Sequence, residues 1–234
     1  MTEPSREPSP WPGPAYPATP PSGAAWPAAP QRSAPTALAV ASGVLAIVLA
    51  LLAVVIAIAS GPASKEFADA ARAGYSTYDV FTSYDGLALL LFPFLIGAYV
   101  VSCLWLQFAR ANTMAIAPRV PHQRGRVWVW LGWWVPIVSL WFPFQVVRDV
   151  QDASRPEGRT VGLGLWWAAW LVYLFGSRVA ASASTSTDPG FIEALPTIEW
   201  INAGALAVAC VQWCRILYVT TTNQQRALAS AAAR

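Results

Sequence analysis

Long apolar runs with few charged residues alternate with short polar connections along most of this chain. As helices, four of these runs are long enough to cross a hydrocarbon core of about 30 Å. They predict transmembrane helices over Ala37 to Ala59, Tyr84 to Phe108, Val161 to Ala180 and Ile198 to Val219. The pattern therefore predicts an all-α integral membrane protein with four transmembrane helices.

A fifth apolar run, Val127 to Val147, departs from this pattern. It contains Pro136 and Pro143, and each proline removes a backbone hydrogen bond and crowds the preceding helical turn. After Pro143, apolar residues recur at helical spacing, and the positions between them hold Gln145, Arg148, Asp149 and Asp152. The run therefore predicts a Trp/Pro-rich segment that re-enters the membrane or lies at its interface, followed by an amphipathic helix.

The charge of each connection predicts its side of the membrane, because cytoplasmic loops are enriched in Lys and Arg. If Val127 to Val147 crosses, a cytoplasmic N-terminus leaves six Lys and Arg residues inside and nine outside. If that run dips in and returns, twelve lie inside and three outside. We favour the second threading over a five-span protein. It places both termini, 110–126 and 148–159 in the cytoplasm, and 60–83 and 181–197 outside.

Aromatic residues gather near the predicted span ends. Trp105, Trp166, Trp167 and Trp213 are expected to mark an inner aromatic belt, and Tyr84 and Trp200 an outer one. In the connection 60–83, a short surface helix is expected over Ala63 to Ala73. Tyr75, Tyr78, Phe81 and Tyr84 follow it at three-residue intervals. An interfacial belt is favoured for these four, with a ligand-binding aromatic patch as the alternative.

The chain begins with a segment of different composition. Residues 1–36 contain eleven of the twenty prolines, separated by Ser, Ala and Gly, and such a stretch buries too little apolar surface to fold. The predicted organisation is a disordered proline-rich cytoplasmic tail over 1–36, a helical membrane domain over 37–220 and a short cytoplasmic tail over 221–234. The N-terminal tail is interpreted as a solvated spacer, with docking to a protein partner as the alternative.

Composition removes several function classes. The net charge is only +3 and no basic block suggests nucleic acid, so the predicted partners are the lipid bilayer and proteins that contact the tail or the cytoplasmic loops. His122 is the only histidine and is expected to be solvated, and the three cysteines lie in apolar runs. No metal, cofactor or catalytic residue is predicted. Asp149 and Asp152 share a helix face, but a solvated amphipathic face explains them better than a catalytic pair.

The candidate motif lies in the Trp/Pro run and the helix after it. WLQFARAN at Trp105–Asn112, followed by VWVWLGWWVPIVSLWFPFQVVRDVQDAS, resembles the actinobacterial family filed as domain of unknown function 4328. The matching positions are Gly132, Trp133, Trp134, Pro136, Leu140, Pro143, Asp149, Ala153 and Ser154. Arg148 lies among them, and Ser139 stands where that family often has Asn. The resemblance covers about residues 95–228 and implies a bacterial inner-membrane protein, without an activity.

Three functions are compatible with these observations. The favoured one is a non-enzymatic membrane protein that scaffolds or regulates partners through its cytoplasmic face and tail. The second is a small transporter or channel subunit in which the broken Trp/Pro segment lines a cavity, as discontinuous helices do in transporters. The least favoured is a membrane enzyme that uses Asp149 and Asp152. Nothing in the sequence predicts an oligomeric state.

Overall fold

The computed structural model describes residues 33–154 and 162–233, so most of the predicted N-terminal tail lies outside the described residues. This part of the chain is all helical and has no strand. Its elements, in chain order, are α1 (Thr36–Arg72), η1 (Thr77–Asp79), α2 (Ser83–Ile116), α3 (Trp128–Leu131), η2 (Val138–Leu140), α4 (Phe142–Ser154), α5 (Leu163–Ser184), α6 (Pro189–Glu193) and α7 (Leu195–Ala232).

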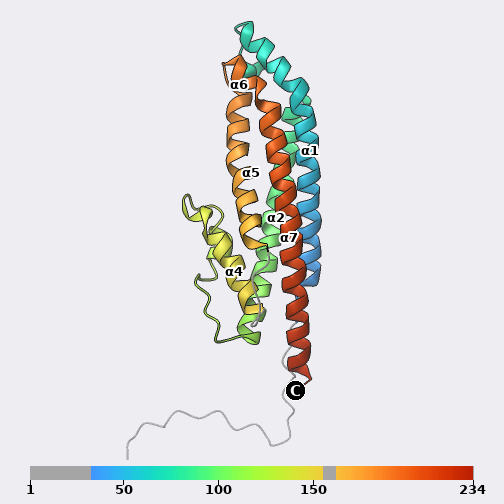
Figure 1. Ribbon diagram of the computed structural model, residues 1–234, viewed down its shortest axis with the longest axis vertical. Coiled ribbons are helices and arrows are strands. Elements are labelled where there is room, and N and C mark those ends of the chain that lie inside the picture. The colour runs from blue at the N-terminus through green and yellow to red at the C-terminus, as the bar shows by residue number, and fades with distance from the viewer. Residues whose placement is uncertain (1–32, 155–161, 234) are drawn as a thin grey trace, which may run out of the picture. The chain divides into compact units, whose positions relative to one another are not determined.

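Four helices of the described part are long and apolar enough to cross a membrane: α1, α2, α5 and α7, the last together with α6. Each of them contains or matches one predicted span, so the expectation of a multi-pass helical protein is confirmed. The four run antiparallel in chain order (Figure 1). The start of α1 and the end of α7 therefore lie at the same end of the bundle, where the Gln225 Nε2 donates to Thr36 Oγ1 at 2.9 Å. We call this the terminal end and the opposite one the α6 end.

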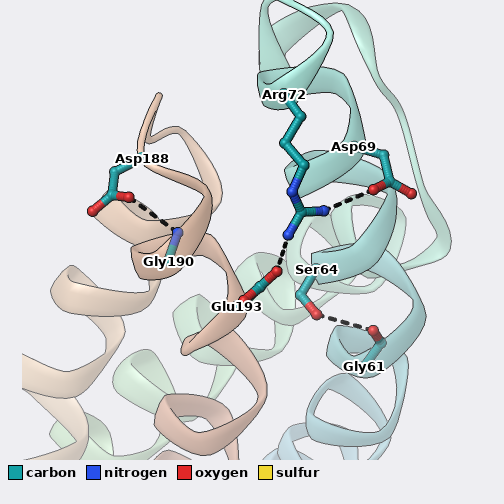
Figure 2. Close-up of polar contacts among 7 residues, drawn as sticks. All are labelled: Gly61, Ser64, Asp69, Arg72, Asp188, Gly190 and Glu193. Atoms are coloured by element: carbon teal, nitrogen blue, oxygen red, sulfur yellow. Dashed lines mark hydrogen bonds and ion pairs between the residues drawn. The ribbon is translucent and has the colours of Figure 1, made fainter.

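Helix α1 is longer than its predicted span. It passes through Pro62 and continues to Arg72, so the short surface helix expected over Ala63 to Ala73 is a continuation of α1. Ser64 Oγ donates to the carbonyl of Gly61 at 3.0 Å, which supplies a local side-chain bond beside the proline (Figure 2). Likewise, α7 extends beyond the predicted Val219 to Ala232.

The α6 end is closed by a polar clasp. Arg72, at the end of α1, donates to Asp69 one turn earlier and also to Glu193 at the end of α6 (Figure 2). Helix α6 begins where the Asp188 carboxylate accepts the backbone N–H of Gly190 at 3.0 Å, an N-cap contact. The clasp ties the α5–α7 connection to α1, although all three charged side chains of the clasp are exposed.

The terminal half of the bundle has a tryptophan core, which corrects the expectation of an inner aromatic belt. Trp105, Trp166, Trp167 and Trp213 are all buried, and Trp105 is only 1% exposed. The Trp213 ring lies edge-on to Trp105 at 5.7 Å and is stacked on Trp166 at 5.2 Å. Three of these indole N–H groups have protein acceptors, because Trp105 donates to Thr221, Trp213 to Ser42, and Trp167 to the carbonyl of Leu140.

Candidate functional site

The Trp/Pro run folds back along the bundle as a hairpin of short elements, α3, η2 and α4 (Figure 1). The part of the hairpin before its tip lies against α2. The Tyr99 hydroxyl donates to the carbonyl of Trp130 at 3.0 Å, and the Tyr99 ring meets the Trp134 ring edge-on at 5.5 Å. The Cys103 thiol donates to the carbonyl of Val129 at 3.2 Å. Two carbonyls of a segment without a continuous helix are thus satisfied by side chains of α2.

The contacts of four motif positions, Gly132, Trp133, Leu140 and Pro143, explain the shape of this hairpin. Gly132 is buried, and a Cβ there would meet the carbonyl oxygen of Trp128 at 2.6 Å, so a larger residue does not fit this turn. The Trp133 ring lies edge-on to Trp167 at 6.2 Å. The Leu140 carbonyl accepts the Trp167 indole N–H at 2.8 Å, and Pro143 is buried in the first turn of α4, where its missing N–H costs no helical bond.

The tip of the hairpin follows Pro136. Ile137 has φ 67° and ψ −56°, and the Val138 N–H bonds to the carbonyl of Pro136 at 2.7 Å, the geometry of a strained γ-turn. Trp134 and Ile137 are 64% and 70% exposed, so the tip presents large apolar side chains to its surroundings.

Helix α4 buries its polar face as well as its apolar one. Asp149 is 5% exposed, and its Oδ2 accepts the backbone N–H of Gln123 at 2.7 Å. The expectation that Asp149 is solvated is therefore wrong, because loop 117–127 covers that side of the helix. Burial raises the pKa of Asp149, an effect reduced by the Gln123 N–H and by Arg148. Asp152 is half-buried, and burial raises its pKa too. The two carboxyl groups do not share one solvated face.

Loop 117–127 is held in place by side chains on both of its flanking helices. Arg110 donates to the carbonyl of Arg124, whose own Nε donates to Gln145 Oε1 at 2.7 Å. His122 Nε2 lies 3.0 Å from Thr113 Oγ1 and is half-buried, so it is not the solvated histidine that was expected. Burial, and secondly Arg110, lowers the pKa of His122. Arg148 joins the same network by donating to Gln123 Oε1 at 2.8 Å.

The end of the motif is anchored to α7 through a buried glutamine. Gln224 is 0% exposed; its Nε2 donates to Ser154 Oγ at 2.9 Å and to the carbonyl of Ala109 at 3.0 Å. Its Oε1 accepts from Asn112 Nδ2 at 3.2 Å. Ala153 is fully buried beside this contact. The motif residues Asp149 and Ser154 therefore join α4 to the loop and to α7.

One buried ionisable residue at the α6 end was missed by the sequence reading. Glu199 is 8% exposed; its carboxylate accepts from the Tyr84 hydroxyl at 2.7 Å and from Asn202 Nδ2 at 3.2 Å. Tyr84 is likewise buried, which corrects its assignment to an outer belt, whereas Trp200 is 52% exposed. One sequence feature could have identified Glu199: it is an acidic residue one position inside a predicted transmembrane span, where charged residues are rare. Within the described ranges, no group of three His, Cys, Asp or Glu side chains is placed to hold a metal.

Comparison with known proteins gives one match. The family model described as "Domain of unknown function (DUF4328)" matches residues 68–224, which include α2 to α6 and most of α7. No curated protein and no solved structure matches the chain.

Proposed function

The chain belongs to the family described as domain of unknown function 4328, and from this premise we propose a non-enzymatic protein of the bacterial plasma membrane that scaffolds or regulates protein partners. The observation that carries the proposal is the fixed conformation of loop 117–127. Buried contacts from α2 and α4 hold this loop on the bundle, while Arg119 and Arg126 on it are exposed. An ordered, exposed cationic loop suits recognition of an acidic protein surface, because little conformational entropy is lost on binding.

The charge distribution supports a cytoplasmic terminal end. Among described residues, that end carries the cations Arg110, Arg119, Arg124, Arg126, Arg148, Arg215 and Arg226, and the acids Asp149 and Asp152. The α6 end carries the cations Lys65, Arg72 and Arg178, and the acids Glu66, Asp69, Asp79, Asp85, Asp188, Glu193 and Glu199. Because cytoplasmic loops are enriched in Lys and Arg, both chain termini are assigned to the cytoplasm.

In this threading, the Trp/Pro hairpin is a re-entrant segment of the inner leaflet. It contacts Tyr99, which precedes Phe108 by nine residues, or about 13 Å of helix. Its exposed tip is apolar, as a lipid-facing surface must be, and its carbonyls at Val129, Trp130 and Leu140 have side-chain donors. A cavity bounded by α1, α2, α5 and α7 opens at the α6 end and is lined by none of residues 127–147, so a transport path along the Trp/Pro segment is not proposed.

Threading is tested by thiol labelling of single cysteines at exposed positions after Cys103, Cys210 and Cys214 are replaced. A membrane-impermeant reagent applied to intact spheroplasts is expected to label Ala73→Cys and Thr187→Cys, and to label Ser33→Cys and Ser230→Cys only after lysis. Labelling of position 230 without lysis, with position 33 still protected, would support five spans instead.

The partner proposal is tested with a photo-crosslinking amino acid placed in the chain in its native membrane. At Arg119 it is expected to give discrete protein adducts, whereas the matched exposed position Thr187 at the α6 end gives none. Adducts should weaken when Gln145→Ala releases Arg124 and loosens the loop. An absence of adducts at position 119, or equal adducts at both positions, would contradict a cytoplasmic docking loop.

A further inference from the structure

A cavity of about 550 Å³ opens among the helices at the α6 end. Its walls come from α1, α2, α5, α7 and the connection before α2. Aromatic side chains form much of the lining: Phe67, Tyr78, Phe81, Tyr84, Phe92 and Tyr173. Such a volume matches ordinary small-molecule sites, which combine apolar walls with a few placed polar groups.

The charged groups that line this cavity are all acidic. Glu199 and Asp85 are both in the lining, and no Lys, Arg or His is. None of the ion pairs between described residues involves Glu199, whose known donors, Tyr84 and Asn202, are neutral. A carboxylate offers about four acceptor sites, so two donors leave it with capacity for a ligand.

Asn202 lies beside Glu199 in the wall of the cavity, and its side chain is 1% exposed. Its Nδ2 donates to Glu199 Oε2 at 3.2 Å and so holds the carboxylate in place. Its Oδ1 lies over Gly176 of α5, where an added Cβ would meet it at 1.9 Å. Gly176 is not in the cavity lining, so this oxygen faces the contact between α5 and α7 and leaves the Glu199 carboxylate as the acceptor for a ligand.

From this arrangement we infer that the cavity binds a primary ammonium group attached to an apolar body. Glu199 neutralises the cation and accepts its N–H groups, and the aromatic side chains of the lining contact the apolar part and favour the positive charge. A quaternary ammonium has the charge but no N–H to donate, and a neutral alcohol lacks the charge. Two sources share this chemistry: a free amine outside the cell and an aminophospholipid headgroup of the outer leaflet.

The test is calorimetric binding of 2-phenylethylamine to the full chain in nanodiscs of phosphatidylcholine and phosphatidylglycerol, which contain no primary amine. We expect saturable binding that is at least about tenfold tighter than that of N,N,N-trimethyl-2-phenylethylammonium or 2-phenylethanol. Glu199→Gln is expected to weaken binding about tenfold or more. The matched control Glu66→Gln removes an exposed charge at the same end and should leave binding unchanged.

A second variant blocks the cavity without removing its negative charge. Ser177→Trp fills the cavity, since Ser177 lines it and its hydroxyl bonds only to its own helix, and it should abolish binding with the helical content unchanged. Phosphatidylethanolamine in the nanodisc should compete with the amine if the headgroup is the ligand, and have no effect if a free amine is. Absent binding, equal binding of amine and alcohol, or an unchanged affinity in Glu199→Gln would overturn the inference. These results are independent of the docking loop at the other end.

Discussion

The two ends of the bundle place their buried polar groups in different surroundings. At the terminal end, Gln224 and Asp149 are enclosed by donors and acceptors from three elements, and buried side-chain atoms of Gln107, Arg110, Gln151 and Thr220 lie there without a partner among the described residues. At the α6 end, Glu199 and Asn202 lie beside a cavity. The comparison teaches that a buried polar residue joins helices where protein fills the space around it, and can receive a ligand where a cavity lies beside it.

The largest loss of stability is expected from a substitution at the terminal end. Trp105→Ala removes a 1% exposed side chain from the tryptophan core and leaves Thr221 without its donor. It should reduce the free energy of unfolding by about 3–5 kcal/mol, measured by denaturation in mild detergent. The matched control Trp200→Ala, at a 52% exposed position of the α6 end, should change it by less than about 1 kcal/mol. Equal losses in the two variants would show that the terminal end is no better packed.

A second substitution tests how tightly side chains pack at the α6 end. Gly176→Ala would place a Cβ 1.9 Å from Asn202 Oδ1, and relieving this clash should cost about 1–3 kcal/mol and weaken amine binding. Gly164→Ala lies on the same helix with nothing within 4 Å of the added Cβ, so it should be neutral or stabilising by up to about 1 kcal/mol. The two variants are compared by thermal unfolding; matching melting temperatures would mean that the Asn202 amide moves freely.

Acidification should weaken the terminal end selectively. The folded-state pKa of His122 is lowered by burial and by Arg110, so the unfolded chain takes up the proton first and stability falls as the pH drops below the ordinary value of about 6.5. Asp149 and Asp152 have raised pKa values and act in the opposite sense: their ionisation costs stability, which is regained as the pH falls through their folded-state pKa towards 3.8.

The free energy of unfolding, measured from pH 7.5 to 5.5, is expected to fall because the unfolded chain protonates His122 more readily. His122→Gln keeps an N–H donor for Thr113 and should flatten the pH dependence in that window. If His122→Gln keeps the full pH dependence of stability, groups other than His122 cause that dependence.

The smallest effect concerns the hairpin tip. Ile137 adopts φ 67° with a branched side chain, so Ile137→Gly should relieve strain and stabilise the protein by up to about 1 kcal/mol after the entropy of glycine is counted. Ile137→Ala removes the same exposed side chain without freeing the backbone and is the control. The difference between the two variants in denaturation midpoint isolates the turn; a zero or negative difference would contradict strain at this position.

The sequence predicted the membrane helices well and their buried faces poorly. Runs such as Ala37 to Ala59 are readable because length and absence of charge are local properties. Whether Trp105 or Trp166 faces lipid or another helix depends on which helices become neighbours, and a belt rule applied to position alone misplaced both. The span predicted over Ala37 to Ala59 and the surface helix predicted over Ala63 to Ala73 are parts of one helix, α1, which continues through Pro62.

The polar residues of the two ends show the same limit. The alternation in α4 correctly separates apolar from polar positions, but Asp149 is buried because a loop 26 residues earlier covers it. Glu199 lies in the span predicted over Ile198 to Val219, and no role was predicted for it, because its partner Tyr84 is 115 residues away. Tertiary contacts across such separations carry no local signal, so the burial and the partners of Asp149 and Glu199 are known only from the structure.

The packing of α1 against α7 has a consequence for synthesis of the chain. Ser42 on α1 accepts the indole N–H of Trp213, which lies 171 residues later, so the two halves of this contact leave the ribosome about 10–30 s apart. During that interval, α7 is not yet present. The hydroxyl of Ser42 and the small-residue face at Ala53 and Ala57, which are buried in the folded protein, then contact lipid or the insertion machinery. Chains arrested before α7 should therefore be a distinct species, inserted but unclosed, and a natural substrate for membrane quality-control proteases.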